Sequence, residues 1–119
     1  MGTNGKDVMD ALKEPAAKLR ELIPNVYAGY TATHRAVFTD GALDRKTKEL
    51  IALAVAVATR CDGCIASHAR GAARMGATPD EVAEALGVTI LMQGGPGTVY
   101  APRALDAFYD YYQAPAGNE

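Results

Sequence analysis

Residues 44–59 read DRKTKELIALAVAVAT, and this stretch decides the fold because charged residues give way to a run that is apolar on every face of a helix. Asp44 is a favourable N-terminal cap, so we predict a helix from there to about residue 59. A helix that is apolar all round is normally buried on all sides. In a chain of 119 residues, this predicts that a second subunit shares in the burial.

Helical patterns recur on both sides of that stretch, and no alternation of apolar and polar residues is long enough to predict a strand. We therefore predict an all-α fold, a bundle of about six helices joined by short loops. Gly76 is placed to end one helix in the left-handed conformation, and Thr78 with Glu81 fits a capping box for the next. The remaining helices are expected over about residues 7–22, 24–38, 64–75, 79–93 and 97–113, with frayed ends at residues 1–6 and 114–119.

Composition and charge predict one globular domain, residues 1–119, and exclude several classes of partner. The net charge of −2, without clustered Lys and Arg, argues against binding to nucleic acid or to an anionic membrane. The longest apolar run, residues 50–58, is far shorter than the roughly 20 residues that span a bilayer. The first residues lack the apolar core of a signal peptide, so we predict a cytoplasmic protein.

The two cysteines of the chain lie three positions apart, in Cys61-Asp62-Gly63-Cys64. The pair stands at the start of the helix predicted over residues 64–75, where unpaired backbone N–H groups and the helix dipole favour a thiolate. In a reducing compartment, such a pair is more often redox-active or metal-binding than structural.

His68 and Glu49 are the candidate acid–base partners of the cysteines. His68 follows Cys64 by four residues and therefore lies one turn further along the same helical face. Its imidazole can take a proton from a thiol and return it to a leaving oxygen. Glu49 stands where the charged start of its helix becomes apolar, so its carboxylate needs a partner, and His68 is the natural one. The sequence thus predicts a Cys–His–Glu relay.

Other interpretations of these residues stay open. The cysteines could form a buried inert pair, or a zinc site completed by His68 and the distant His34. His34 lies in a polar stretch and is expected to be solvated. A thioredoxin-like fold is excluded by the helices predicted on both sides of the cysteines. We expect an aromatic cluster to form core and subunit interface: Tyr100, Phe108, Tyr109, Tyr111 and Tyr112.

The register of Glu49, Cys61, Cys64 and His68 resembles the signature of the AhpD-like alkylhydroperoxidase branch of the carboxymuconolactone decarboxylase family. The resemblance extends over about residues 22–113. It is carried also by the segments LDRKTKELI at residues 43–51, HARGA at residues 68–72, GATPDEV at residues 76–82 and GGP at residues 94–96.

The resemblance implies an all-helical fold, with the cysteine pair at the start of a central helix, that assembles as a homotrimer or homohexamer. It implies an antioxidant peroxidase, or a disulfide reductase, that cycles through a redox-active Cys61–Cys64 disulfide and needs no bound cofactor. Cys64 is then the nucleophile and Cys61 the more exposed partner, while His68 and Glu49 relay protons. The substrate is a hydroperoxide or a disulfide, and the implied redox partners are a lipoyl-bearing protein or a peroxiredoxin.

Gly63 departs from the resemblance, because the best-known members carry a further histidine just before the second cysteine. The relay is therefore one group shorter here, and Asp62 beside it would raise the pKa of a neighbouring thiol. Two alternative functions are weighed against the peroxidase. One is a carboxymuconolactone decarboxylase-like lyase, which does not depend on paired cysteines, and the other is a non-enzymatic redox sensor or metal-binding helical module.

Overall fold

A computed structural model describes residues 4–114, and within them the chain forms six α-helices and no strand, which confirms the predicted fold class. The helices are α1 (Lys6–Leu22), α2 (Pro24–Val37), α3 (Arg45–Ala58), α4 (Asp62–Arg74), α5 (Pro79–Gln93) and α6 (Gly95–Tyr109). The predicted bounds of two helices are wrong. α4 starts two residues earlier than predicted, because Cys61 is its N-terminal cap. α6 runs from Gly95 to Tyr109 rather than over 97–113, because a proline is favourable in the first turn of a helix.

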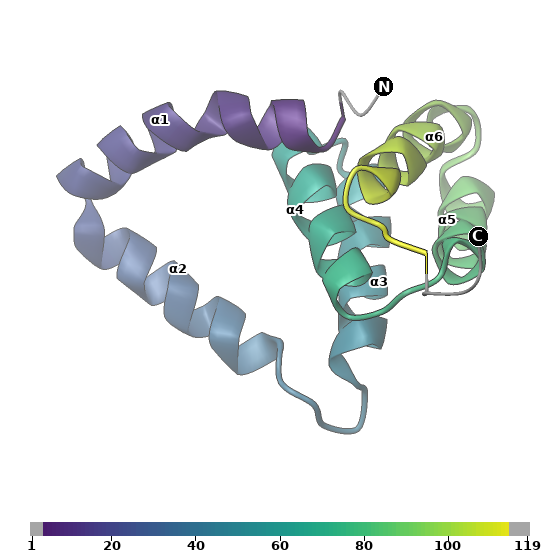
Figure 1. Cartoon of the computed structure of the whole chain (residues 1–119), viewed down its shortest axis with the longest axis horizontal. Coiled ribbons are helices and arrows are strands. Elements are labelled where there is room, and N and C mark those ends of the chain that lie inside the picture. Colours follow the sequence, from purple (N-terminus) through teal and green to yellow (C-terminus); the bar gives the residue numbers. More distant parts are fainter. Residues whose placement is uncertain (1–3, 115–119) are drawn as a thin grey trace.

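Helices α3 to α6 form the bundle, while α1 and α2 form an arm that projects from it (Figure 1). The core lies between the four bundle helices, and no residue of α1 or α2 is buried. Many of the buried positions are alanines, so the helices approach one another closely. The largest fully buried side chains are Leu53, Val57, Ile65, Val82 and Phe108.

The apolar helix α3 is buried on one side only within the single chain. Leu53 and Val57 are in the core, but Ile51 and Val55 on the same helix remain 49% and 55% exposed. Burial of that side by a second subunit stays a prediction.

The base of the arm is fixed by hydrogen bonds to the bundle. The Lys48 ammonium on α3 donates to the carbonyls of Val37, at 2.9 Å, and Thr39, at 2.7 Å, which lie at the end of α2. These bonds satisfy carbonyl groups that a helix C-terminus leaves without partners.

The predicted fraying of the N-terminal end is wrong for residues 4–6. The side chain of Asn4 donates to Asp106 at 2.9 Å, and the Lys6 N–H donates to Asp110 at 2.8 Å. Both acceptors lie at the end of α6, so the start of α1 is held against the bundle. Residues 1–3 and 115–119 lie outside the part of the chain that the structure describes.

The predicted helix caps are confirmed. Gly76 has a φ of 87° and follows the end of α4 as a left-handed cap, while Thr78 and Glu81 form the capping box of α5. The Glu81 carboxylate also accepts from the Lys46 ammonium at 2.9 Å, which links the start of α5 to α3. Over residues 4–114, no helix combines the length and the apolar character that crossing a bilayer requires.

We expect Thr78→Ala to destabilise the protein by about 1 kcal/mol, because it removes the hydroxyl that accepts from the Glu81 N–H at 3.1 Å. Urea unfolding followed by circular dichroism, at one protein concentration, measures the change. The control is Thr31→Ala, within α2, where alanine replaces a weaker helix former that caps nothing. Equal unfolding midpoints for Thr78→Ala and the parent would contradict this account of the cap.

Candidate functional site

The backbone of Cys61 is held by the turn that ends α3. The Cys61 N–H donates to the Ala56 carbonyl and the Arg60 N–H to the Val57 carbonyl, each at 3.1 Å, which is the Schellman pattern. Arg60 takes the left-handed position at φ 55°, where glycine is usual and another residue costs on the order of 1 kcal/mol. The chain thus enters α4 with Cys61 in a fixed place.

Cys61 is also the N-terminal cap of α4. Its sulfur accepts from the Cys64 N–H at 3.3 Å, and its carbonyl accepts from the Ile65 N–H at 2.8 Å. The two sulfurs form a disulfide across a Cα–Cα distance of 5.2 Å. Both therefore lie where the helix presents unpaired N–H groups and the positive end of its dipole.

The relative exposure of the two cysteines is the reverse of what the family resemblance implies. In the single chain Cys64 is exposed and Cys61 is half-buried, so the expectation that Cys61 is the more exposed is wrong here. The physical reason is the Schellman hydrogen bond, which draws Cys61 against the end of α3.

The structure brings Glu49 of α3 and His68 of α4 together. The Glu49 carboxylate accepts a 2.7 Å hydrogen bond from Nδ1 of His68, and Glu49 is only 9% exposed. Because an ionised carboxylate can only accept, the proton lies on Nδ1, and Nε2 is left to take or return another proton. The catalytic role of these residues stays a prediction.

Gly71 makes room for this pair, and the sequence reasoning did not identify it. A Cβ at Gly71 would overlap the Glu49 carboxylate, which lies directly against the backbone of α4. A glycine inside a helix costs roughly 1 kcal/mol relative to alanine, so its place in the alanine-rich segment HARGAA is the signal that marks a close approach.

Gly63, the position that departs from the family pattern, lies under the arm. A Cβ there would come within 2.9 Å of a methyl group of Leu12 on α1. In this chain, helix α1 therefore occupies the side of the cysteine turn toward which a side chain at position 63 would project.

His34 joins the site from α2, although its polar neighbours predict a solvated side chain. The ring is exposed, yet it lies 4.6 Å from the Phe38 ring and 6.2 Å from the His68 ring, nearly parallel to the latter. Phe38 and His68 also stack, at 5.5 Å. The signal in the sequence is the spacing of four from Tyr30 to His34 to Phe38, which places three rings on one face of α2.

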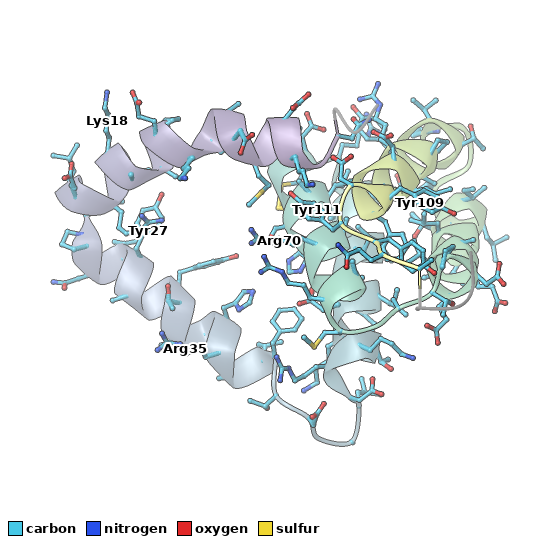
Figure 2. All side chains as sticks on the ribbon, in the orientation of Figure 1. Lys18, Tyr27, Arg35, Arg70, Tyr109 and Tyr111 are labelled. Carbon is cyan, nitrogen blue, oxygen red and sulfur yellow. A yellow bond between two sulfur atoms is a disulfide. The ribbon has the colours of Figure 1, made fainter. Side chains whose placement is uncertain are left out.

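A cavity of about 220 Å³ lies beside the Glu49–His68 pair. Its wall contains His34, Arg45, Arg70 and Arg74 in addition to that pair. Figure 2 shows Arg70 extending from α4 toward α2. Among the residues that the structure describes, no group of three or more His, Cys, Asp and Glu side chains is arranged to hold a metal ion.

Comparison with known sequences places most of the chain in one family. Residues 24–107 match the carboxymuconolactone decarboxylase family. An uncharacterised protein of Cupriavidus necator is 36% identical over 96% of this chain and 100% of its own length. Another from Haemophilus influenzae is 41% identical over 91% of this chain and 96% of its own. A protein of the cox locus of Paracoccus denitrificans is 46% identical over 64% of this chain and 68% of its own.

The fold agrees with a solved structure. The crystal structure of the apo form of a carboxymuconolactone decarboxylase family protein from Legionella pneumophila superposes with a TM-score of 0.86 and 40% identity. The match covers 90% of this chain and 96% of that one.

We expect Gly71→Ala to destabilise the protein by about 1–3 kcal/mol, because the new methyl group displaces the Glu49 carboxylate from a buried, charge-assisted hydrogen bond. The downfield proton signal of the His68 Nδ1–H should disappear from the NMR spectrum of the variant.

Gly87→Ala is the matched control, since Gly87 lies within α5 and a Cβ there meets nothing within 4 Å. It should stabilise the protein by up to about 1 kcal/mol. If Gly71→Ala and Gly87→Ala changed the free energy of unfolding in the same direction, Glu49 would not need the space at Gly71.

Proposed function

The chain belongs to the carboxymuconolactone decarboxylase family, and from this premise we propose that it is an AhpD-like, thiol-dependent peroxidase or disulfide reductase. The observation that carries the proposal is a disulfide at the start of α4 beside a buried Glu–His pair. A lyase of the same fold has no need of the disulfide, which is why we favour redox chemistry.

In the oxidative half of the proposed cycle, Cys64 is the nucleophile. His68 takes the thiol proton, and the Cys64 thiolate attacks the terminal oxygen of the hydroperoxide. The O–O bond breaks, the alkoxide takes the proton back as an alcohol, and Cys64 becomes a sulfenic acid. Cys61 then attacks the Cys64 sulfur, and the S–S bond forms as water leaves. Two thiols and one hydroperoxide thus give one disulfide, one alcohol and one water.

The positions of the two sulfurs support these roles. Cys64 is exposed, so a substrate from solvent can reach it, and His68 lies one helical turn away on the same face. Cys61 is half-buried and accepts a backbone hydrogen bond, which suits the sulfur that closes the disulfide.

The reductive half of the cycle needs a dithiol reductant. One reductant thiolate attacks the exposed Cys64 sulfur, and Cys61 leaves as a thiolate. That leaving group is stabilised by the Cys64 N–H and by the N-terminus of α4. The second reductant thiol then closes the reductant's own disulfide and frees Cys64. A lipoyl-bearing protein supplies such a dithiol, and a peroxiredoxin is a second redox partner that we propose.

We expect Cys64→Ser to lower the rate of oxidation by tert-butyl hydroperoxide at least about 100-fold, because the nucleophile is lost. Cys61→Ser should still react once and trap a sulfenic acid on Cys64. Rapid quenching and mass spectrometry separate the two outcomes: loss of two hydrogens in the parent, and a dimedone adduct in Cys61→Ser.

His68→Gln tests the relay in the same assay and should slow the first step about 100-fold or more. Full activity in Cys64→Ser would exclude the proposed cycle. Turnover of a lactone acid by a variant that lacks both cysteines would favour a lyase instead.

We also propose that the chain assembles with copies of itself, as a trimer or a hexamer. The arm is a pair of amphipathic helices without a buried residue, and short helices gain most of their stability from packing. Large apolar side chains are exposed on the arm, on α3 and on α5: Leu22, Val26, Tyr30, Val55, Leu91 and Met92.

Light scattering after size-exclusion chromatography should give a mass three or six times that of the chain at micromolar concentration. Val55→Glu should lower the mass, because it places a charge on the exposed apolar side of α3. Ala42→Glu, in the loop before α3, adds the same charge outside these surfaces and should leave the assembly intact. A monomeric parent protein would contradict the assembly.

A further inference from the structure

The cavity beside His68 carries an excess of positive charge. Three guanidinium groups line it, from Arg45 at the start of α3 and from Arg70 and Arg74 on α4. Among the described residues of the cavity wall, Glu49 is the one with a carboxylate, and that carboxylate is hydrogen-bonded to His68. Over residues 4–114, none of the three arginines takes part in an ion pair.

Neighbouring groups on the α4 side form no ion pair with these arginines in the described part of the chain, although Asp10 and Arg70 line a further pocket together. Tyr111 lies near Arg70 and Arg74, and burial raises the pKa of its hydroxyl above the usual value, against the opposing effect of the two arginines. Tyr111 is therefore uncharged at neutral pH. Asp10 and Asp110 also face Tyr111, but neither forms an ion pair with an arginine in the described part of the chain.

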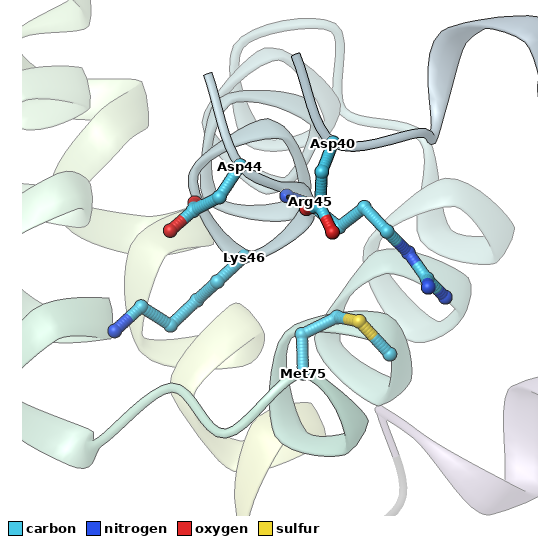
Figure 3. Close-up of a pocket in the computed structure, with 5 residues that line it drawn as sticks. All are labelled: Asp40, Asp44, Arg45, Lys46 and Met75. Carbon is cyan, nitrogen blue, oxygen red and sulfur yellow. Dashed lines mark hydrogen bonds between the residues drawn. The ribbon is translucent and has the colours of Figure 1, made fainter. Parts of the chain in front are cut away.

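The acidic groups on the other side of Arg45 are already engaged with backbone. Arg45 and Met75 line both this cavity and a neighbouring pocket, drawn in Figure 3, whose wall also contains Asp40 and Asp44. Asp40 accepts from the Arg45 N–H at 2.8 Å, and Asp44 accepts from the Thr47 N–H at 2.8 Å. In the described part of the chain no ion pair joins the Arg45 guanidinium to either carboxylate, so the guanidinium remains available to the cavity.

The chemistry that such a cavity recognises is a small anion. Guanidinium groups bind carboxylates and phosphates through paired hydrogen bonds, and His34 and His68 add ring nitrogens to the wall. The volume of about 220 Å³ is below that of a drug-sized site, so the occupant is a molecule of few carbons.

The wall of the cavity does not include Cys64, but it includes His68, which lies one helical turn beyond Cys64. Cys64 stands four residues before His68, which is roughly 6 Å along the helix axis. Side chains of a helix lean toward its N-terminus, so Arg70 and Arg74 lean toward His68. A short molecule can therefore place an anionic end among the arginines and its other end at Cys64.

We propose that this cavity binds the carboxylate of the peroxide substrate, which is a small organic acid that carries a hydroperoxide. The assignment rests on the proposed peroxidase function. The assignment predicts that an anionic hydroperoxide reacts faster than an uncharged one, a selectivity that the Cys–His–Glu set alone does not provide.

Binding can be tested without turnover. The chain has two histidines, and both line the cavity, so their ring C–H signals report on it. Titration of the disulfide form with glutarate should shift both signals, while the uncharged glutaramide should not. Arg70→Gln and Arg74→Gln should each weaken glutarate binding about tenfold. Absence of a glutarate shift, or tighter binding of inorganic phosphate than of glutarate, would overturn the carboxylate assignment.

The control for these variants is Arg35→Gln. Arg35 lies on α2, outside the wall of the cavity, and Figure 2 shows it on the outer side of that helix. Glutarate should bind this variant as it binds the parent. An equal loss of binding in Arg35→Gln would mean that overall charge, and not the cavity, attracts the acid.

The substrate assignment is tested by oxidation of the reduced protein. γ-Hydroperoxy-γ-methylvaleric acid and its amide differ only in charge, and the acid should oxidise the parent thiols at least about tenfold faster. In the double variant that combines Arg70→Gln and Arg74→Gln, only the reaction with the acid should slow, so the rates for the acid and the amide should become similar. Equal rates in the parent would overturn this inference and leave the peroxidase proposal standing. If neither compound oxidises the protein faster than it oxidises free dithiothreitol, the peroxidase proposal itself fails.

Discussion

The buried hydrogen bond between Glu49 and His68 is the interaction on which the site depends. It joins the two central helices, α3 and α4, at 2.7 Å, in a part of the protein where an unpaired carboxylate would be costly. A buried carboxylate with its hydrogen-bond partner adds little net stability compared with apolar packing, so its presence in so small a core is better explained by chemistry. The backbone of α4 makes room for the pair, because the carboxylate occupies the space of the side chain that Gly71 lacks, although glycine is a poor helix former.

Much of the fold follows from local signals in the sequence. The caps at Asp44, Gly76 and Thr78 are confirmed because the side chain or the backbone freedom of a single residue decides each of them. The pairing of Glu49 with His68 is predicted for a different reason, since a carboxylate at the edge of an apolar run needs a partner.

Other features of the site could not be read from sequence, because they depend on contacts between distant segments. His34 reaches His68 only because the chain turns back after α2, and Lys48 holds that turn by two backbone carbonyls. The exposure of the cysteines depends in the same way on how the turn at Arg60 packs against α3. Glycines at positions 63 and 71 are visible in the sequence, but the atoms that require them, from Leu12 and Glu49, lie on other helices.

The distribution of charge along α4 accounts for both ends of the site. Its N-terminus carries the positive end of the helix dipole, where it favours a thiolate on Cys61 or Cys64. Its last turn carries the negative end, which favours a cation, and Arg74 lies there. The helix therefore stabilises an arginine that has no carboxylate partner in the described part of the chain. Arg45 has the opposite situation, since it begins α3, where the dipole disfavours a positive charge. An anion in the cavity would offset the unfavourable interaction between the Arg45 charge and the dipole of α3. Of the three arginines, Arg45 is therefore the one at which binding of an acid and stability of the fold are most closely linked.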